Sequence, residues 1–303
     1  MSTTPPNIDP RAAALFQTDG RLRRRRIVNR LMEALGTIAS LAAVAVLVIV
    51  VASVVKNGWG AFSVEFFTTS PSLSGFGTAE GGILSSIVGS ILLVVIATIF
   101  ALPIGVLVAI FVSEVAPRKV ADVIRLALDV INGLPTIVTG IFIFSVLVLA
   151  QGQSAIAGGL ALAIIGLPLI ARSAQEVLRL VPTSYREAGL ALGAPRWRTI
   201  LGVILPTSLG GILTGTTLAI ARVAGETAPL LFTTSLAVTT SVTWDPTQPV
   251  QSMPLTIFQY AEQPDPSFHE QAWATGAVLL AFVLVVSLIS KFLLARSRRK
   301  LTQ

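Results

Sequence analysis

Long apolar segments alternate with shorter polar ones along the whole chain. A helix needs about 20 mostly apolar residues to cross the hydrocarbon core of a bilayer. Five segments meet that requirement plainly, and a sixth meets it while carrying an arginine and a glutamate. The pattern predicts six transmembrane helices, at about Leu31–Val55, Ile83–Val112, Val130–Ala150, Ala155–Ala171, Thr207–Val238 and Ala272–Ser290.

Prolines fall inside three of these segments, namely Pro103, Pro135 and Pro168. Proline is tolerated in membrane helices because neighbouring helices satisfy the freed carbonyls, so we expect the spans to continue through them. The first segment is too long for the apolar core of a signal peptide, and no small-x-small cleavage site follows it. We therefore interpret it as a retained helix.

Basic residues gather on one side of the predicted membrane. The four segments that hold 20 of the 22 Lys and Arg residues are 1–30, 113–129, 172–206 and 291–303. The two connections between them, 57–82 and 239–271, contain acidic residues and no Lys or Arg. Cytoplasmic loops are the ones enriched in Lys and Arg, so the sequence predicts a bacterial inner-membrane protein with both termini in the cytoplasm.

Three regions follow from this layout. Residues 1–30 are predicted to be a disordered basic arm, whose Arg21–Arg26 cluster lies at anionic head groups. Residues 31–294 are predicted to form the six-helix domain, and residues 295–303 a basic cytoplasmic tail.

Composition excludes several classes of protein. The chain is 53% hydrophobic and 12% charged, whereas a soluble domain is about 25% charged. Its net charge of +7 is compatible with nucleic-acid binding, but no recognition module accompanies the basic clusters, so the predicted partner is membrane lipid. There is no cysteine, and the single histidine, His269, is expected to be a solvated loop residue. Neither a metal site nor a catalytic residue is predicted, which disfavours a membrane enzyme.

The most informative local signals lie in the third basic segment. Pro182 interrupts the preceding helix, and Ser184 with Glu187 three residues later forms an S-x-x-E capping box that predicts a new helix start. Gly193 suits the C-terminal cap of that short helix, and Pro195 suits the first turn of a second helix. The sequence thus predicts a cytoplasmic helical hairpin, which is either an ordinary loop or a knob that another protein grips.

This hairpin resembles the EAA loop of the membrane subunits of ABC importers. Glu187-Ala188, Gly193 and Pro206 stand at the spacing of that motif, with Gly189 in place of its third residue. The resemblance implies that Arg186–Ala194 is a coupling helix that docks on a separate ATPase. The residues it assigns to coupling are Ser184, Arg186, Glu187, Ala188, Gly193, Ala194 and Pro206.

The chain itself has no Walker A motif, because none of its four lysines follows a glycine. No cofactor is therefore expected on this chain. The resemblance instead implies that ATP and Mg²⁺ are bound by a separate partner protein.

Two charges interrupt the fifth predicted span. Arg222 and Glu226 are four residues apart, which places them on one face of a helix, where they can pair. Charges at this depth are costly, so we expect them to face the bundle interior or a water-filled path. The pair is either a structural ion pair or part of a route for an anion, which the planar guanidinium would meet. Arg172, at the end of the fourth span, is either a second pathway residue or a cytoplasmic anchor.

Several stretches resemble the family of phosphate-specific ABC importer permeases. They are Gly81–Ile83, Gly133–Gly140, Ala219–Phe232 and Ser252–Leu255. One departure is Gln175, where the family commonly has an acidic residue three positions after Arg172. The resemblance implies a type I ABC importer permease fold and a substrate path between this chain and a homologous second permease. It also implies two further partners, namely a homodimeric ATP-binding subunit on the cytoplasmic side and an extracytoplasmic phosphate-binding protein.

Other functions remain compatible with parts of the pattern. A permease for another oxyanion, such as molybdate or sulfate, is the nearest alternative, and the residues around Arg222 argue against it. A channel or membrane anchor without ATP coupling is disfavoured by the predicted cytoplasmic hairpin.

Overall fold

A computed structural model of the chain describes residues 20–72, 80–234 and 241–301. The chain divides into two compact units, Met1–Ser53 and Val54–Gln303. The described part of the first unit belongs to helix α2 (Gly20–Gly58), whose apolar side chains from Ile27 to Val51 are exposed, as a lipid-facing span requires. Since α2 begins at Gly20, residues 20–30 of the predicted disordered arm are helical, and residues 1–19 lie outside the described part.

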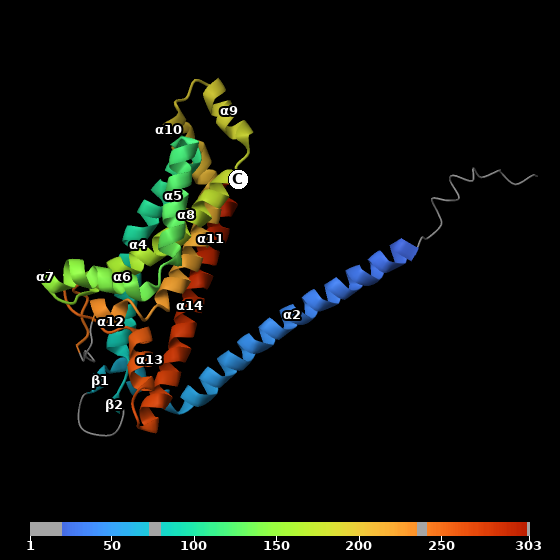
Figure 1. Ribbon diagram of the computed structural model, residues 1–303. Coiled ribbons are helices and arrows are strands. Elements are labelled where there is room, and N and C mark those ends of the chain that lie inside the picture. The colour runs from blue at the N-terminus through green and yellow to red at the C-terminus, as the bar shows by residue number, and fades with distance from the viewer. Residues whose placement is uncertain (1–19, 73–79, 235–240, 302–303) are drawn as a thin grey trace, which may run out of the picture. The chain divides into compact units, whose positions relative to one another are not determined.

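Four long helices lie side by side in the second unit (Figure 1). They are α4 (Leu84–Ile110), α8 (Ala155–Leu180), α11 (Leu205–Ala224) and α14 (Pro266–Leu301). Helix α8 packs against both α4 and α11, and α14 packs against α11. A core cluster joins the first three helices through residues such as Leu93, Leu162 and Val223.

Short elements close the two ends of this bundle (Figure 1). Helices α9 (Thr183–Ala191) and α10 (Arg196–Thr199) lie at the end where α14 finishes. At the opposite end lie α13 (Met253–Ala261) and the antiparallel strands β1 (Pro71–Ser72) and β2 (Glu80–Gly81), with Pro71 opposite Gly81. The other short elements are η1 (Trp59–Ala61), α3 (Val64–Thr68) and α12 (Leu230–Thr233). The basic hairpin and the acidic connection before α14 therefore lie at opposite ends of the bundle.

Five helices in the described part of the chain are long and apolar enough to cross a membrane, and a bent helix pair supplies a sixth segment. That pair is α5 (Arg118–Gly133) followed by α6 (Thr136–Ile143), which meet at a bend of 95°. This arrangement confirms the predicted all-α membrane fold. The prediction of one straight third span, Val130–Ala150, was wrong.

The bend occurs at Leu134-Pro135. A residue before proline favours extended backbone, and Leu134 is extended, with φ −68° and ψ 138°. Gly133, a poor helix former, ends α5 just before it. Pro103 and Pro168 lie inside unbroken α4 and α8, as predicted. The same Gly-Leu-Pro tripeptide occurs at 166–168 inside unbroken α8, so it does not by itself break a helix.

Turns of π-helix extend three of the helices. They are η2 (Phe111–Val115) after α4, η3 (Phe144–Val148) between α6 and α7 (Leu149–Gln151), and η4 (Ile200–Ile204) between α10 and α11. Pro206 follows η4, where the wider turn accommodates a residue without an N–H. Arg196–Ala224 is consequently one apolar helical segment, and the predicted span Thr207–Val238 was wrong at its end. Residues 235–240 lie outside the described part.

Glycines allow α11 to approach α8 closely. A Cβ atom on Gly211 would lie 2.6 Å from both methyl carbons of Val177, and one on Gly215 would lie 2.5 Å from the Cβ atom of Ser173. Small residues four apart are a common means of close packing between membrane helices. The α8–α11 contact therefore depends on these two positions.

We predict that Gly211→Ala lowers the thermal midpoint of the detergent-purified protein, because overpacking costs about 1–3 kcal/mol. Gly202→Ala is the matched control, since a Cβ atom there meets nothing within 4 Å. Adding Val177→Ala to Gly211→Ala is expected to restore the midpoint. Equal midpoints for the two single variants would contradict this account of the packing.

Candidate functional site

The predicted hairpin is present as α9, a tight turn and α10. Gly193 has φ +73°, in the left-handed region that favours glycine. The N–H of Gly193 donates to the carbonyl of Leu190 at 2.9 Å, and that of Ala194 donates to Gly189 at 3.0 Å. These two bonds are the Schellman arrangement, so the prediction of a glycine cap is confirmed. Pro195 stands immediately before α10.

The predicted capping box is wrong. Helix α9 begins at Thr183 with Pro182 as its N-cap, and no side chain caps it. Pro182 itself starts the helix from extended backbone, with φ −57° and ψ 144°, which leaves Ser184 inside the first turn. Ser184 and Glu187 are both exposed there.

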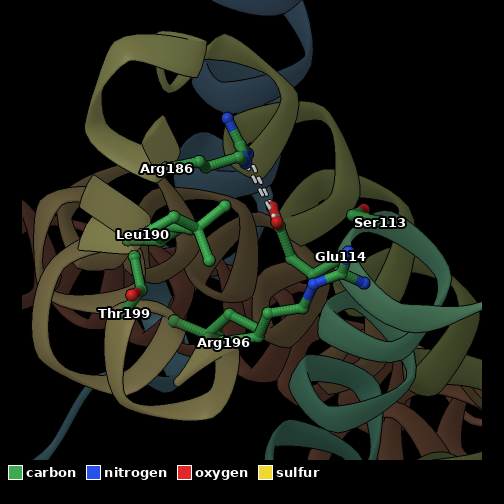
Figure 2. Close-up of a pocket in the computed structure, with 8 residues that line it drawn as sticks. Ser113, Glu114, Arg186, Leu190, Arg196 and Thr199 are labelled. Carbon is green, nitrogen blue, oxygen red and sulfur yellow. Dashed lines mark hydrogen bonds and ion pairs between the residues drawn. The ribbon is translucent and has the colours of Figure 1, made fainter. Parts of the chain in front are cut away.

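Arg186 points from α9 into the bundle, where Glu114 of η2 receives it (Figure 2). The guanidinium donates to the two carboxylate oxygens of Glu114 at 2.9 and 2.6 Å. It also donates to the backbone carbonyls of Val181 at 2.7 Å and Leu178 at 3.0 Å. The hydrogen bond and charge of Glu114 raise the pKa of Arg186 above its ordinary value, so the guanidinium stays protonated. Such bidentate pairs are the strongest and most directional of protein ion pairs.

A cavity of about 340 Å³ lies beside this pair (Figure 2). Its walls include Ser113, Arg196 and Thr199, and the hydroxyls of Ser113 and Thr199 have no hydrogen-bond partner among the described residues. Thr199 also explains the glycine in place of the third EAA residue, because a Cβ atom on Gly189 would lie 2.6 Å from the Thr199 methyl carbon. Packing of α9 on α10 therefore requires glycine at that position.

The outer face of the hairpin is exposed. Glu187 and Ala188 lie on it, with Leu192 at 87% exposure and Trp197 at 63%. Ala194 and Pro206 are half-buried at the turn and at the start of α11. The hairpin thus offers apolar side chains and a carboxylate to a partner, while Arg186 is directed inward.

Arg222 and Glu226 do come together, although not on one helix. Helix α11 ends at Ala224, Gly225 caps it, and Glu226 lies in the following turn. The Arg222 Nε and Glu226 Oε1 atoms are 4.0 Å apart, which is an ion pair without a hydrogen bond. The Arg222 side chain is 57% exposed and that of Glu226 is 17% exposed. The guanidinium therefore has donors available for an anion.

Arg172 belongs to a separate ion pair. It binds Asp129 of α5, and the two residues border a cavity of about 210 Å³ together with Arg125, Gln175 and Arg179. Ser173 faces Gly215 across the α8–α11 contact. Seven residues of helix, roughly 10 Å, separate Gly215 from Arg222. The structure thus places Arg172 and Arg222 at different levels of the bundle.

The acidic partners of Arg186 and Arg172 were not predicted from the sequence. Glu114 and Asp129 lie 72 and 43 residues before the arginines that they bind. Each lies at the end of an apolar run, or just after one, and has basic residues nearby. A contact with lipid head groups explains the presence of a charge there equally well. Only the fold brings them to Arg186 and Arg172. In the described part of the chain, no group of three or more His, Cys, Asp and Glu residues is arranged to hold a metal ion.

Comparison with known proteins places these features in a wider group. A family model described as "Binding-protein-dependent transport system inner membrane component" matches residues 101–303. "Phosphate transport system permease protein PstA" of Yersinia pestis is 37% identical over 280 residues, which cover 90% of this chain and 92% of that protein. "Phosphate transport system permease protein PstA 1" of Mycobacterium tuberculosis (strain ATCC 25618 / H37Rv) is 32% identical, with 91% of each chain covered.

Solved structures share the fold at low sequence identity. A bacterial alginate ABC transporter, in complex with an alginate-bound periplasmic protein, gives a TM-score of 0.60 at 12% identity, over 88% of this chain and 93% of that one. An inward-facing MetNI methionine ABC transporter gives 0.55 at 16% identity, over 70% and 93%. These likenesses confirm the predicted importer-permease fold.

We predict that Gly193→Val opens the turn between α9 and α10, because a β-branched residue is strained at φ +73°. Left-handed backbone costs about 1–2 kcal/mol for an ordinary residue. Trypsin is then expected to cleave after Arg196 and Arg198 faster than in the unmodified protein. Gly193→Asn is the control, since asparagine visits this region readily. Identical cleavage rates in all three proteins would show that the turn does not depend on glycine.

Proposed function

The chain belongs to the binding-protein-dependent transport system inner membrane components, and on that basis we propose that it is the permease subunit of an ATP-driven importer of inorganic phosphate. The assignment of phosphate as the substrate rests on the 37% identity of this chain, over 280 residues, to a protein named as a phosphate transport permease. The chain is a multi-pass inner-membrane transport subunit rather than an enzyme. Its permease domain in this proposal comprises residues 31–294.

Arg222 is the group that meets the anion in this proposal. Its guanidinium presents planar donors that fit phosphate oxygens, and its only ion pair among the described residues is the loose one with Glu226. Glu226 orients the guanidinium or accepts a proton from a protonated phosphate. A charge within a membrane-spanning segment is costly unless it serves a path or a partner, which supports the functional role. Arg172, bound to Asp129, is a second station nearer the hairpin.

Partners are assigned to the two ends of the bundle. A homodimeric ATPase, with ATP and Mg²⁺, docks on the hairpin through the exposed residues of α9. An extracytoplasmic phosphate-binding protein docks near α13, and a homologous second permease completes the path. ATP binding draws the two coupling helices together and opens the path outward. This chain supplies gating and a route, with no covalent chemistry. The opposite placement of the basic hairpin and α13 supports this arrangement.

Arg222→Gln is expected to reduce uptake of radiolabelled phosphate by about 10- to 100-fold, because hydrogen bonds to a charged group contribute about 1.5–3 kcal/mol. Assembly with the ATPase should be unchanged. Lys119→Gln is the control, since Lys119 is exposed in the first turn of α5. Full uptake by Arg222→Gln would leave the Arg222–Glu226 pair as scaffold. Uptake of labelled molybdate or sulfate by the unmodified complex, without uptake of labelled phosphate, would overturn the substrate assignment.

Leu192→Asp is expected to release the ATPase from the membrane, because it places a charge on the most exposed apolar side chain of the hairpin. Val64→Asp is the matched control, since Val64 is 81% exposed on α3, which shortly precedes β1 at the opposite end of the bundle. The ATPase retained after affinity purification of this chain is the measurement. Equal retention in both variants would mean that the ATPase docks elsewhere.

A further inference from the structure

We propose that Glu114 is a positioning residue, which ties the coupling helix α9 to α4 so that displacement of α9 is delivered to α4. This inference rests on the proposed function, since it concerns how ATP-driven motion enters the membrane domain. The Glu114–Arg186 pair, called the clamp below, is the physical link. Neither residue has to contact the substrate or ATP for this role.

The clamp has the geometry of a rigid joint. Two carboxylate oxygens and two backbone carbonyls hold one guanidinium at 2.6 to 3.0 Å. The carboxylate side chain is only 7% exposed and that of Arg186 is 27% exposed. A planar group bound at four points cannot rotate without breaking several bonds at once. The clamp therefore fixes the orientation of α9 as well as its distance from α4.

Little else holds α9 on the bundle. None of its residues is buried. It also packs against η4, and Gly189 contacts Thr199 on α10, both in the segment that leads into α11. The clamp is the bond that links α9 to the extension of α4.

The position of Glu114 directs the link to α4. Glu114 lies in η2, a π-turn that continues α4 without a break, and π-turns redirect side chains at functional positions. Helix α4 packs along α8 through Leu93, Ile96 and Ala101. A load on Glu114 thus reaches the central helices of the bundle.

The covalent chain offers a second route. Helix α10 continues through η4 into α11, which ends near Arg222. Movement of α9 reaches α11 by this route and α8 through Val181-Pro182, whereas the clamp is its direct link to α4. With it, α4 and α11 are moved together from one docking element, on either side of α8.

The test uses this chain purified with its native companion subunits and reconstituted in vesicles. Glu114→Gln removes the negative charge with little change in shape. Arg186→Lys keeps the positive charge but loses the planar guanidinium that binds both carboxylate oxygens. We expect each variant to assemble and hydrolyse ATP, while phosphate moved per ATP hydrolysed falls about tenfold. Asp122→Asn, which breaks the exposed Asp122–Arg125 pair, is the matched control and should leave that ratio unchanged.

A covalent replacement separates positioning from stability. The chain has no cysteine, so Glu114→Cys with Arg186→Cys provides its only two thiols. Joining them with a short bis-maleimide is expected to restore the ratio that the double variant loses. The clamp is overturned if Glu114→Gln couples normally, or if the cross-link stops the uptake that remains.

Failure of the proposed function gives a different result. An unmodified complex that moves no phosphate would refute the substrate assignment alone. The clamp would then be tested by measuring how strongly the binding protein stimulates ATP hydrolysis. That stimulation requires a signal to cross the membrane domain, whatever the substrate is. Stimulation retained in Glu114→Gln overturns the clamp, and its loss there, but not in Asp122→Asn, supports it.

Discussion

One guanidinium ties the α9–α10 hairpin to the helix bundle. Arg186 leaves a helix with no buried residue and satisfies both oxygens of a nearly buried carboxylate and two backbone carbonyls. Because the hydrophobic effect contributes little there, hydrogen bonding and charge determine where α9 lies. An exposed knob can accept a partner's force only if its own attachment is stiff, and a bidentate ion pair supplies that stiffness.

The long helices behind the hairpin are packed closely enough to move together as a few rigid elements. Helix α8 contacts α4 through a continuous apolar core and approaches α11 at Gly211 and Gly215. Packed interiors transmit displacement because they have little room to deform. Arg222 lies in the last turn of α11, far along the segment that begins at the hairpin. Trp197 on the exposed hairpin and Arg222, the proposed anion contact, are thus joined by continuous helix.

Local signals were sufficient for much of this description. Apolar runs located the spans, and Gly193 marked the turn, because both depend on backbone and lipid physics within a few residues. The bend at Pro135 was missed, since similar prolines leave α4 and α8 intact. The end of α11 at Gly225 was missed because apolar residues continue beyond it in the sequence. The Glu114–Arg186 and Asp129–Arg172 pairs were missed for a different reason. Their partners are distant in sequence, and a single sequence does not record which charges meet.

In the transporting complex, α9 and α4 are expected to move as one body. Spin labels at Thr183→Cys, at the start of α9, and Leu107→Cys on α4 give that distance directly by double electron–electron resonance, because both side chains are exposed and the native chain has no cysteine. We expect one narrow distance distribution, unchanged between nucleotide-free and ATP-bound complexes, and a broadened one in the Glu114→Gln background. A shift of that distance on ATP binding in an otherwise unmodified, transporting complex would contradict the account.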